Sequence, residues 1–313
     1  MKPLIHDRRE LDAHHDRYRA LLCRGDGRLD DRLRAGRMER VSFATLRRGY
    51  DLLLLDAFGV LYRDRTAIAG AAAAVARLYR EGVAWLVLSN NASQSPAHLT
   101  ARLGAMGLAV RQEEILTSGM AVRPFVAASP WYGLPYCLVG PAEAEAAYAP
   151  EPERLCVNHG ALETARYLLL CSNRDYYGSP WQRQVEGLLA ERRLPIVLAN
   201  PDLVTPDGAG GLTVVAGYTA VEWVARFGCA WVGVGKPFSP LYALVRQRFP
   251  GVAPDRVLMV GDSLDTDILG GAAQGFATCL TLSGLHAADG DGVEALCRRR
   301  GICPDFVVQS IAT

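Results

Sequence analysis

Lysine is almost missing from this chain. Only Lys2 and Lys236 occur among its 34 basic residues, and arginine supplies the others. With 33 acidic residues the net charge is +1, so the chain as a whole has no electrostatic attraction for nucleic acid or for a membrane surface, and we expect neither as a partner. The interior Lys236 marks either a position that needs a compact ammonium group in place of a guanidinium fork, or a chance occurrence.

Paired cysteines, a signal peptide and long apolar runs are also missing. The charged N-terminus lacks the apolar stretch of a signal peptide, and no apolar run approaches the length of a membrane span. No CxxC pair or histidine at zinc-site spacing occurs, so we expect reduced thiols in a cytoplasmic globular protein. The eight cysteines are Cys23, Cys137, Cys156, Cys171, Cys229, Cys279, Cys297 and Cys303.

Strand-like and helix-like segments alternate from residue 51 onward. The leucine run at 52–55 reads as a strand buried on both faces, and an apolar helix follows it over 69–82. A second strand at 84–89 leads to a helix that begins at Ser95 and Pro96. The alternation predicts an α/β fold with a doubly wound parallel-sheet core, Rossmann-like in its right-handed crossovers.

The middle of the chain is too large to be a connecting loop. Residues 131–230 contain their own strand-like and helix-like runs, which predicts an inserted α/β cap domain. The core domain then comprises 49–130 and 231–313. Residues 1–48, which are rich in arginine and aspartate, are expected to form a helical N-terminal extension.

Polar residues follow apolar strands at several distant points of the chain. Asp56, Ser89 and Asp262 each end such a run, Asp267 lies close behind Asp262, and Lys236 lies in a Gly-Lys-Pro turn. The carboxyl ends of parallel strands meet at one edge of a sheet, so we expect these side chains to form one site. Carboxylates, an ammonium group, a hydroxyl and glycine-adjacent amides suit a divalent cation together with a phosphate.

The order of these stretches resembles the haloacid dehalogenase-like (HAD) superfamily from residue 51 to about residue 284. The details are similar to its class IIA, C2-capped branch, which includes nitrophenyl phosphate, nucleotide, phosphoglycolate and pyridoxal phosphate phosphatases. The stretches that carry the resemblance are DAFGVLY, LSNNASQS, ANPDLVTPDGAG, GKPFSPLY and GDSLDTDI.

The resemblance implies an Mg²⁺-dependent phosphate monoester hydrolase. Asp56 would attack phosphorus and form an aspartyl phosphate. Asp56, Asp262 and the backbone carbonyl of Phe58 would bind Mg²⁺. Asp267 would support the metal site by contacting the ligands of the metal, or would orient Lys236. Independently, two carboxylates about 5 Å apart repel by about 3 kcal/mol at an effective dielectric constant near 20, so Asp56 and Asp262 need a cation or a proton between them.

The same resemblance implies the substrate contacts and partners. The phosphate of a small-molecule ester would be held by Ser89, Asn90, Asn91 and Lys236, with Asp202 also at the substrate. A homodimer formed through the cap is a further expectation. The side chains Tyr176, Tyr177 and Trp181 either line the cap's substrate site or belong to the cap interior.

Phe58 departs from the pattern of the family. Most of its phosphatases place a second aspartate there, whose carbonyl binds the metal and whose side chain protonates the leaving alcohol. Phenylalanine retains the carbonyl but lacks the acid, and losing a positioned acid costs about 10²- to 10⁴-fold in rate. We therefore expect a weakened or relocated general acid.

Several interpretations of Phe58 stay open. The acid comes from Asp202, His159 or His286, or else the acyl phosphate persists in a slow phosphatase or phosphotransferase. The chain could instead be a catalytically impaired binding or regulatory protein that retains the fold and the metal site. A 2-haloacid dehalogenase-type hydrolase ranks last, because Asp262 and Asp267 would crowd its site without a cation.

Overall fold

The computed structural model describes residues 4–5, 16, 27–156, 159–206, 211–287 and 292–313. The described residues divide into two compact units, each of which contains a parallel sheet and is named here by it. The seven-stranded unit takes its residues from 15–89, 96–116 and 242–313, and the four-stranded unit takes them from 1–14, 90–95 and 117–241.

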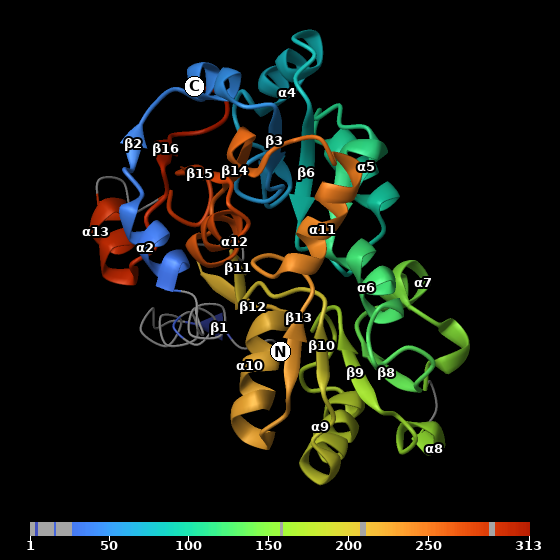
Figure 1. The fold of residues 1–313 in the computed structure, drawn as a ribbon. Coiled ribbons are helices and arrows are strands. Elements are labelled where there is room, and N and C mark those ends of the chain that lie inside the picture. Colours follow the sequence, from blue (N-terminus) through green and yellow to red (C-terminus); the bar gives the residue numbers. More distant parts are fainter. Residues whose placement is uncertain (1–3, 6–15, 17–26, 157–158, 207–210, 288–291) are drawn as a thin grey trace. The chain divides into compact units, whose positions relative to one another are not determined.

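The seven-stranded sheet has a point at which its strand order reverses. The chain runs outward from β3 to β6 and β7 on one side, then returns to β14 and continues to β15 and β16 on the other. The pairings from β2 through β6 are all parallel. This confirms the predicted α/β class and puts the reversal between β3 and β14. The order is β2 (Glu39–Arg40), β16 (Phe306–Val308), β15 (Ala277–Thr281), β14 (Val257–Gly261), β3 (Leu52–Leu55), β6 (Trp85–Ser89) and β7 (Ile115–Thr117) (Figure 1).

Both faces of this sheet are apolar. All four leucines of β3 are fully buried, as expected for a parallel strand that is covered on both sides. The helices and turns of the unit are α2 (Gly27–Ala35), α3 (Phe43–Leu46), η1 (Arg47–Gly49), α4 (Ala71–Arg80), α5 (Pro96–Ala105), η2 (Gln112–Glu114), α11 (Ser239–Arg248), η4 (Pro254–Arg256), η5 (Leu264–Ile268), α12 (Leu269–Ala273) and α13 (Val293–Arg300). A hairpin, β4 (Tyr62–Arg63) with β5 (Thr66–Ala67), follows β3.

The four-stranded unit has a parallel sheet and a small antiparallel one. The parallel sheet has the order β13 (Trp231–Gly233), β10 (Ile196–Leu198), β9 (Tyr167–Leu170) and β8 (Tyr136–Val139) (Figure 1). The antiparallel sheet has the order β1 (Leu4–Ile5), β12 (Leu212–Val214) and β11 (Val204–Pro206). The helices are α6 (Ser118–Ala127), α7 (Ala142–Tyr148), η3 (Pro152–Arg154), α8 (His159–Leu162), α9 (Pro180–Arg192) and α10 (Ala216–Phe227).

Two segments pair differently from the sequence expectation. Strand β13 pairs in parallel with β10, so residues 231–233 belong to the sheet of the four-stranded unit, whereas the sequence placed 231 onward in the core. An apolar run predicts a buried strand without indicating which sheet the strand joins. Within the expected helical extension, α2 is helical, but β2 adds an edge strand to the seven-stranded sheet. A two-residue strand has no periodicity that a sequence could show.

The cysteines and the possibility of a membrane-spanning helix can both be examined in the structure. Seven cysteines are free and buried, and Cys23 lies outside the described residues. Among the residues that the structure describes, no helix combines the length and the apolar character that crossing a membrane requires.

Candidate active site

Three carboxylates meet in the seven-stranded unit, next to the reversal of its strand order. Asp56 directly follows β3 and Asp262 directly follows β14, and these two strands pair in parallel. The backbone N–H of Asp56 donates to the carbonyl of Val260 at 2.9 Å, which extends the pairing past the strand end. Asp267 completes the group, in which one oxygen atom of each carboxylate lies within 4.8 Å of the others.

The Asp262 carboxylate packs against the backbone of two glycines, Gly59 and Gly284, which together form what is called here its seat. A Cβ atom at Gly59 or at Gly284 would lie 1.9 Å from Oδ2 of Asp262, so neither position has room for a side chain. Gly59 also has a φ of +77°, a conformation that L side chains rarely adopt. The N–H of Leu285 donates to the same oxygen at 2.8 Å and fixes its direction.

Asp267 is held by the turn that precedes it. Its side chain is fully buried, and a Cβ atom at Gly261 would lie 2.0 Å from its Cγ atom. The N–H of Ser263 donates to Asp267 Oδ2 at 3.1 Å. The segment η5 is a π-helical turn in which the N–H groups of Asp267 and Ile268 both bond to the Ser263 carbonyl at 3.1 Å. Single π turns are common at functional sites.

This group of carboxylates fits a hard divalent cation. Three carboxylates this close repel one another strongly, and two of them, on Asp262 and Asp267, are buried. Mg²⁺ takes oxygen ligands and commonly needs few protein carboxylates. The sequence expectation that Asp56, Asp262 and Asp267 lie together agrees with the structure.

Phe58 contributes packing at the start of the loop after Asp56. Its half-buried ring meets the ring of Tyr62 edge to face, at 5.7 Å between centroids and 85° between planes, and it packs against the apolar cluster beneath β3. Burial raises the pKa of Tyr62, and the nearby charge of Asp56 adds to this, although Arg102 above the ring opposes it. The side chain at position 58 therefore belongs to an apolar contact.

In the four-stranded unit the amide of Asn90 joins two further loops. Its Oδ1 atom accepts the N–H of Lys236 at 2.7 Å, and its Nδ2 atom donates to the Lys236 carbonyl at 3.0 Å and to Asp202 Oδ1 at 2.8 Å. Gly235 makes this possible, because a Cβ atom there would lie 2.5 Å from Asn90 Oδ1. Lys236 itself is 1% exposed.

The neighbouring Asn91 organises its own loop. Its Oδ1 atom accepts the N–H of Ser93 at 2.8 Å, the Ser93 hydroxyl at 3.1 Å and the N–H of Gln94 at 3.2 Å. This oxygen is thus used inside the loop. The sequence had predicted Asn90 and Asn91 as phosphate contacts without these side-chain roles. Those of Asn90 depend on residues 112 and 146 positions away, whereas those of Asn91 are local to its loop.

The predicted site residues thus form two groups, each described within its own unit. One contains the three carboxylates, whose unit also includes Ser89 at the end of β6. The other contains Asn90, Asn91, Asp202 and Lys236. That the two groups meet around one phosphate stays a prediction.

Three other residues singled out in the sequence have mixed outcomes. Tyr176 is 2% exposed and meets Trp223 edge to face at 5.5 Å, which makes it part of the interior of its unit. His286 is half-buried and follows Leu285, the residue that bonds Asp262. His159 begins α8, and its side chain lies outside the described residues.

Comparisons with known proteins agree with this geometry. The chain matches a family described as haloacid dehalogenase-like hydrolase over residues 53–149 and a HAD-hydrolase-like family over residues 233–313. It is 31% identical to glycerol-3-phosphate phosphatase of Gallus gallus, over 89% of this chain and 95% of that protein. It is 29% identical to chronophin of Homo sapiens, over 88% of this chain and 97% of that protein.

Solved structures show the same fold. A p-nitrophenyl phosphatase from Archaeoglobus fulgidus superposes with a TM-score of 0.70 and 25% identity, over 84% of this chain and 97% of that chain. A possible sugar phosphatase from Cytophaga hutchinsonii superposes with a TM-score of 0.77 and 24% identity, over 88% of this chain and 99% of that chain. With its acidic group at the strand reversal, the chain belongs to the haloacid dehalogenase-like hydrolase superfamily, in its class IIA phosphatase branch.

Proposed function

We propose that this chain is an Mg²⁺-dependent hydrolase of small phosphate monoesters that works through an aspartyl phosphate on Asp56. The observation that carries the proposal is the grouping of Asp56, Asp262 and Asp267 at the carboxyl ends of β3 and β14. Ligands of open α/β sheets bind at such a reversal of strand order. The glycerol-3-phosphate phosphatase and the p-nitrophenyl phosphatase named above are phosphatases by name, which supports the same reaction class.

Asp56, Asp262 and Asp267 would hold the metal together with the carbonyl of Phe58. When bound, Mg²⁺ offsets the negative charge of the carboxylates and of the phosphate. The donor set supports Mg²⁺ because it consists of oxygen atoms.

The chain's own residues would divide the reaction into two displacements. A carboxylate oxygen of Asp56 bonds to phosphorus while the bond from phosphorus to the ester oxygen breaks, and that oxygen leaves as an alkoxide or phenolate, which takes its proton from water or from another acid. Water then attacks the phosphorus of the acyl phosphate, which releases inorganic phosphate and restores the carboxylate. Ser89, Asn90, Asn91 and Lys236 would bind the phosphoryl oxygens. The Asn90 amide would fix the backbone of Lys236 and the side chain of Asp202.

Phe58 sets the expected substrate range. Its ring offers no proton to a leaving alcohol, so protonation by a positioned acid is lost unless Asp202, His159 or His286 supplies it. Loss of this acid slows hydrolysis most for esters with alkoxide leaving groups and least for esters that release a stable phenolate. We therefore infer that aryl phosphates are hydrolysed much faster than alkyl phosphates.

A second candidate function is supported by the same residue. A chain that retains the acidic group but lacks the usual acid fits a binding or regulatory protein that holds a phosphate ester without useful turnover. Dehalogenation of 2-haloacids is the weakest alternative, because the buried carboxylates of Asp262 and Asp267 beside Asp56 would be costly without a cation.

Two further assignments come from the resemblance. Residues 131–230, together with β13, would act as the cap that selects the leaving group, while 49–130 and the residues after β13 would form the catalytic core. A homodimer would form through the cap.

The proposal is tested by steady-state kinetics on 4-nitrophenyl phosphate and on glycerol phosphate with Mg²⁺. We expect the wild type to favour the aryl ester, and Asp56→Asn to abolish turnover of both. Phe58→Asp should raise kcat on the alkyl ester by about 10²-fold or more by restoring the acid. Phe58→Asn is the matched control, since it makes the same loss of packing without supplying a proton.

Each outcome separates the candidates. A phosphoryl adduct on Asp56, seen by mass spectrometry after rapid quenching, supports the phosphatase. No activity in any variant, with normal folding and Mg²⁺ binding, supports the binding protein. Halide release from 2-haloacids without metal would overturn both, and equal gains in Phe58→Asp and Phe58→Asn would refute the account of the missing acid.

A further inference from the structure

A further buried carboxylate lies in the turn that carries Asp267. Asp265 is 4% exposed, yet it is not part of the group formed by Asp56, Asp262 and Asp267. A buried carboxylate stays ionised only with a close partner, because it has lost its hydration. One partner of Asp265 is Arg300, whose Nη1 atom lies 2.7 Å from Oδ2.

Arg300 lies at the end of α13, a helix that is distant in sequence from Asp265. Arg300 is the last residue of α13, 35 positions after Asp265, and positions 293, 296, 297 and 300 lie on one face of that helix. The first three are buried on the same apolar cluster as the turn: its members include Leu264, Ile268, Val293, Leu296 and Cys297. Packing of α13 therefore brings Arg300 to Asp265.

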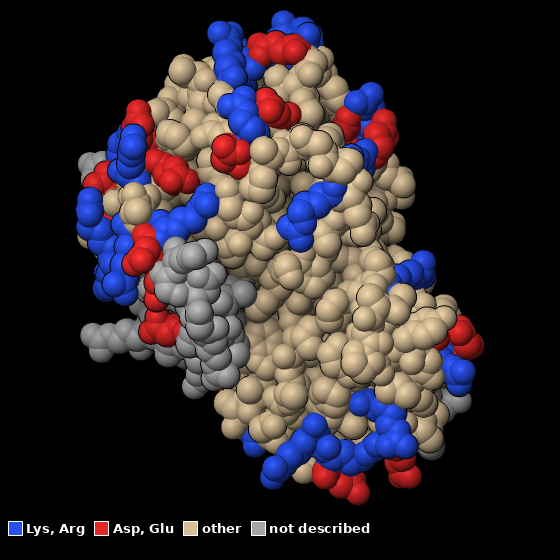
Figure 2. Space-filling model, in the orientation of Figure 1, with Lys and Arg blue, Asp and Glu red and all other residues tan. Residues whose placement is uncertain are grey.

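The end of α13 carries three arginines of different exposure. Positive side chains gather in Figure 2 where α13 and α2 lie in Figure 1. Arg298 and Arg299 are exposed, whereas the Arg300 side chain is 13% exposed where it meets Asp265. Any cation at a helix C-terminus interacts favourably with the helix dipole, so the dipole alone does not account for the burial of Arg300.

We propose that Arg300 is a positioning residue of the metal site: through Asp265 it fastens the turn that presents Asp262 and Asp267. The inference rests on the proposed function, since it concerns the same Mg²⁺ site. Without Arg300, the Asp265 side chain loses this contact, and the turn is no longer held to the end of α13. This release shifts η5, whose backbone sets the direction of Asp267. Outer partners of metal ligands commonly change metal affinity by about 10- to 100-fold.

The sign of the effect distinguishes positioning from simple charge. Removal of a nearby positive charge, acting through space alone, would make the site more negative and tighten Mg²⁺ binding. Loss of positioning weakens it. Arg299→Met is the matched control, because it removes the same charge from the same helix end at an exposed position.

The experiment is isothermal titration of the full chain with MgCl₂, well below the melting temperature of each variant. We expect Arg300→Met to raise the Kd for Mg²⁺ by about 10- to 100-fold, Arg300→Lys to restore most of the affinity, and Arg299→Met to leave it unchanged. Asp265→Asn/Arg300→Met removes both charges of the pair and supplies the measurement if Arg300→Met does not fold. Its Kd should also be raised, because the turn is no longer fastened.

Three results would overturn the inference alone. The first is a Kd for Mg²⁺ equal to that of the wild type, in folded Arg300→Met or in the double variant. The second is tighter Mg²⁺ binding in Arg300→Met, and the third is a change in Kd in Arg299→Met equal to that in Arg300→Met. A lower melting temperature with unchanged Kd would reduce the pair to a purely structural role. Absence of Mg²⁺ binding in the wild type would instead refute the proposed function, and this inference with it.

Discussion

At the scale of single residues, the metal site depends on space that glycines leave empty. The Asp262 carboxylate lies against the backbone of Gly59 and Gly284, and Leu285 bonds it from the same loop. The Ser283 hydroxyl donates to the Gly59 carbonyl at 2.7 Å, so the two glycine loops are also tied to each other. The position of Asp262 is therefore set by its neighbours rather than by its own rotamer alone.

Gly284→Ala should displace Asp262. The new Cβ atom would lie 1.9 Å from Asp262 Oδ2 and 2.6 Å from its Cβ atom, so rotation of the carboxylate alone does not relieve the contact. We expect a loss of stability of about 1–3 kcal/mol in urea unfolding and a rise of about tenfold or more in the Kd for Mg²⁺. Gly251→Ala, with nothing within 4 Å of the new atom, is the control. An unchanged Kd in Gly284→Ala would contradict the role of this seat.

Sequence reasoning reaches the carboxylates but not their surroundings. Asp56 and Asp262 could be predicted because parallel strands end at a common edge, a rule that needs only the strand positions. Gly284 could not be predicted, since nothing near it in sequence shows that it faces Asp262. The Asn90 amide and Arg300 were missed for the same reason: their partners lie 146 and 35 residues away.

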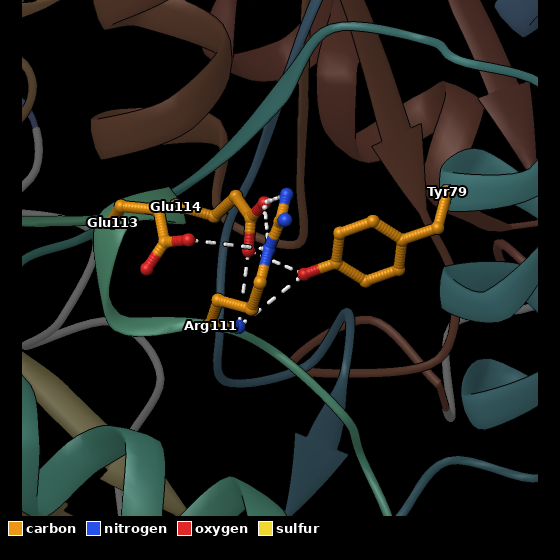
Figure 3. A network of polar contacts seen from close by, with 4 residues as sticks. All are labelled: Tyr79, Arg111, Glu113 and Glu114. Carbon is orange, nitrogen blue, oxygen red and sulfur yellow. Dashed lines mark hydrogen bonds and ion pairs between the residues drawn. The ribbon is translucent and has the colours of Figure 1, made fainter.

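At the scale of elements, a polar network joins the end of α4 to the turn η2. The nearly buried Glu114 carboxylate accepts the N–H of Arg111 at 3.0 Å and its Nε–H at 2.9 Å, and it also accepts the hydroxyl of Tyr79 (Figure 3). Burial alone would raise the pKa of Glu114, but the hydrogen bonds from Arg111 and Tyr79 outweigh it and hold the pKa below its usual value.

Glu114→Gln should reduce stability in a pH-dependent way. Because the pKa of Glu114 is lower in the folded state, its ionised form stabilises the fold above the unfolded pKa of about 4.3, and this contribution is lost as pH falls through the folded value. In urea unfolding we expect a deficit of about 1–3 kcal/mol at pH 7 that shrinks near pH 3.

The neighbouring Glu113 provides the control for that measurement. Its exposed carboxylate lies 3.3 Å from Arg111 Nε, and exposed ion pairs contribute little. Glu113→Gln should therefore stay within about 0.5 kcal/mol of the wild type at both pH values. A deficit in Glu114→Gln that is the same at pH 3 and pH 7 would show that lost packing, and not the charge, is responsible.

Elements differ in how far their sequence predicts them. The strand β3 and the helix α5 follow from four consecutive leucines and from Pro96 at a helix start, which are local signals. The π turn η5 has no such signal, because its extra residue is stabilised by bonds to Ser263 and by the packing of Leu264 and Ile268. The sequence GDSLDTD predicts that a helix begins here, but it does not predict that the first turn is π-helical.

At the scale of the whole molecule, the α/β class with an inserted parallel sheet was predictable because apolar runs, helices and strand ends all agreed. The boundaries were less predictable. The segment 231–233 has the apolar pattern of any buried strand, and its pairing with β10 depends on competition between two sheets that no local pattern records.

Metal should stabilise one unit of this molecule, because all three carboxylates belong to the seven-stranded unit. A ligand that binds the folded state at 100 times its Kd stabilises it by about 2.7 kcal/mol, which corresponds to about 5–10 °C in melting temperature for a unit of this size. Calorimetry in EDTA and in saturating Mg²⁺ measures the shift. In Asp262→Asn the shift should disappear, while the new amide still accepts the N–H of Leu285. That variant should melt no lower than the wild type in EDTA, since one of three repelling charges has been removed. An equal Mg²⁺ shift in both proteins would mean that the cation binds elsewhere.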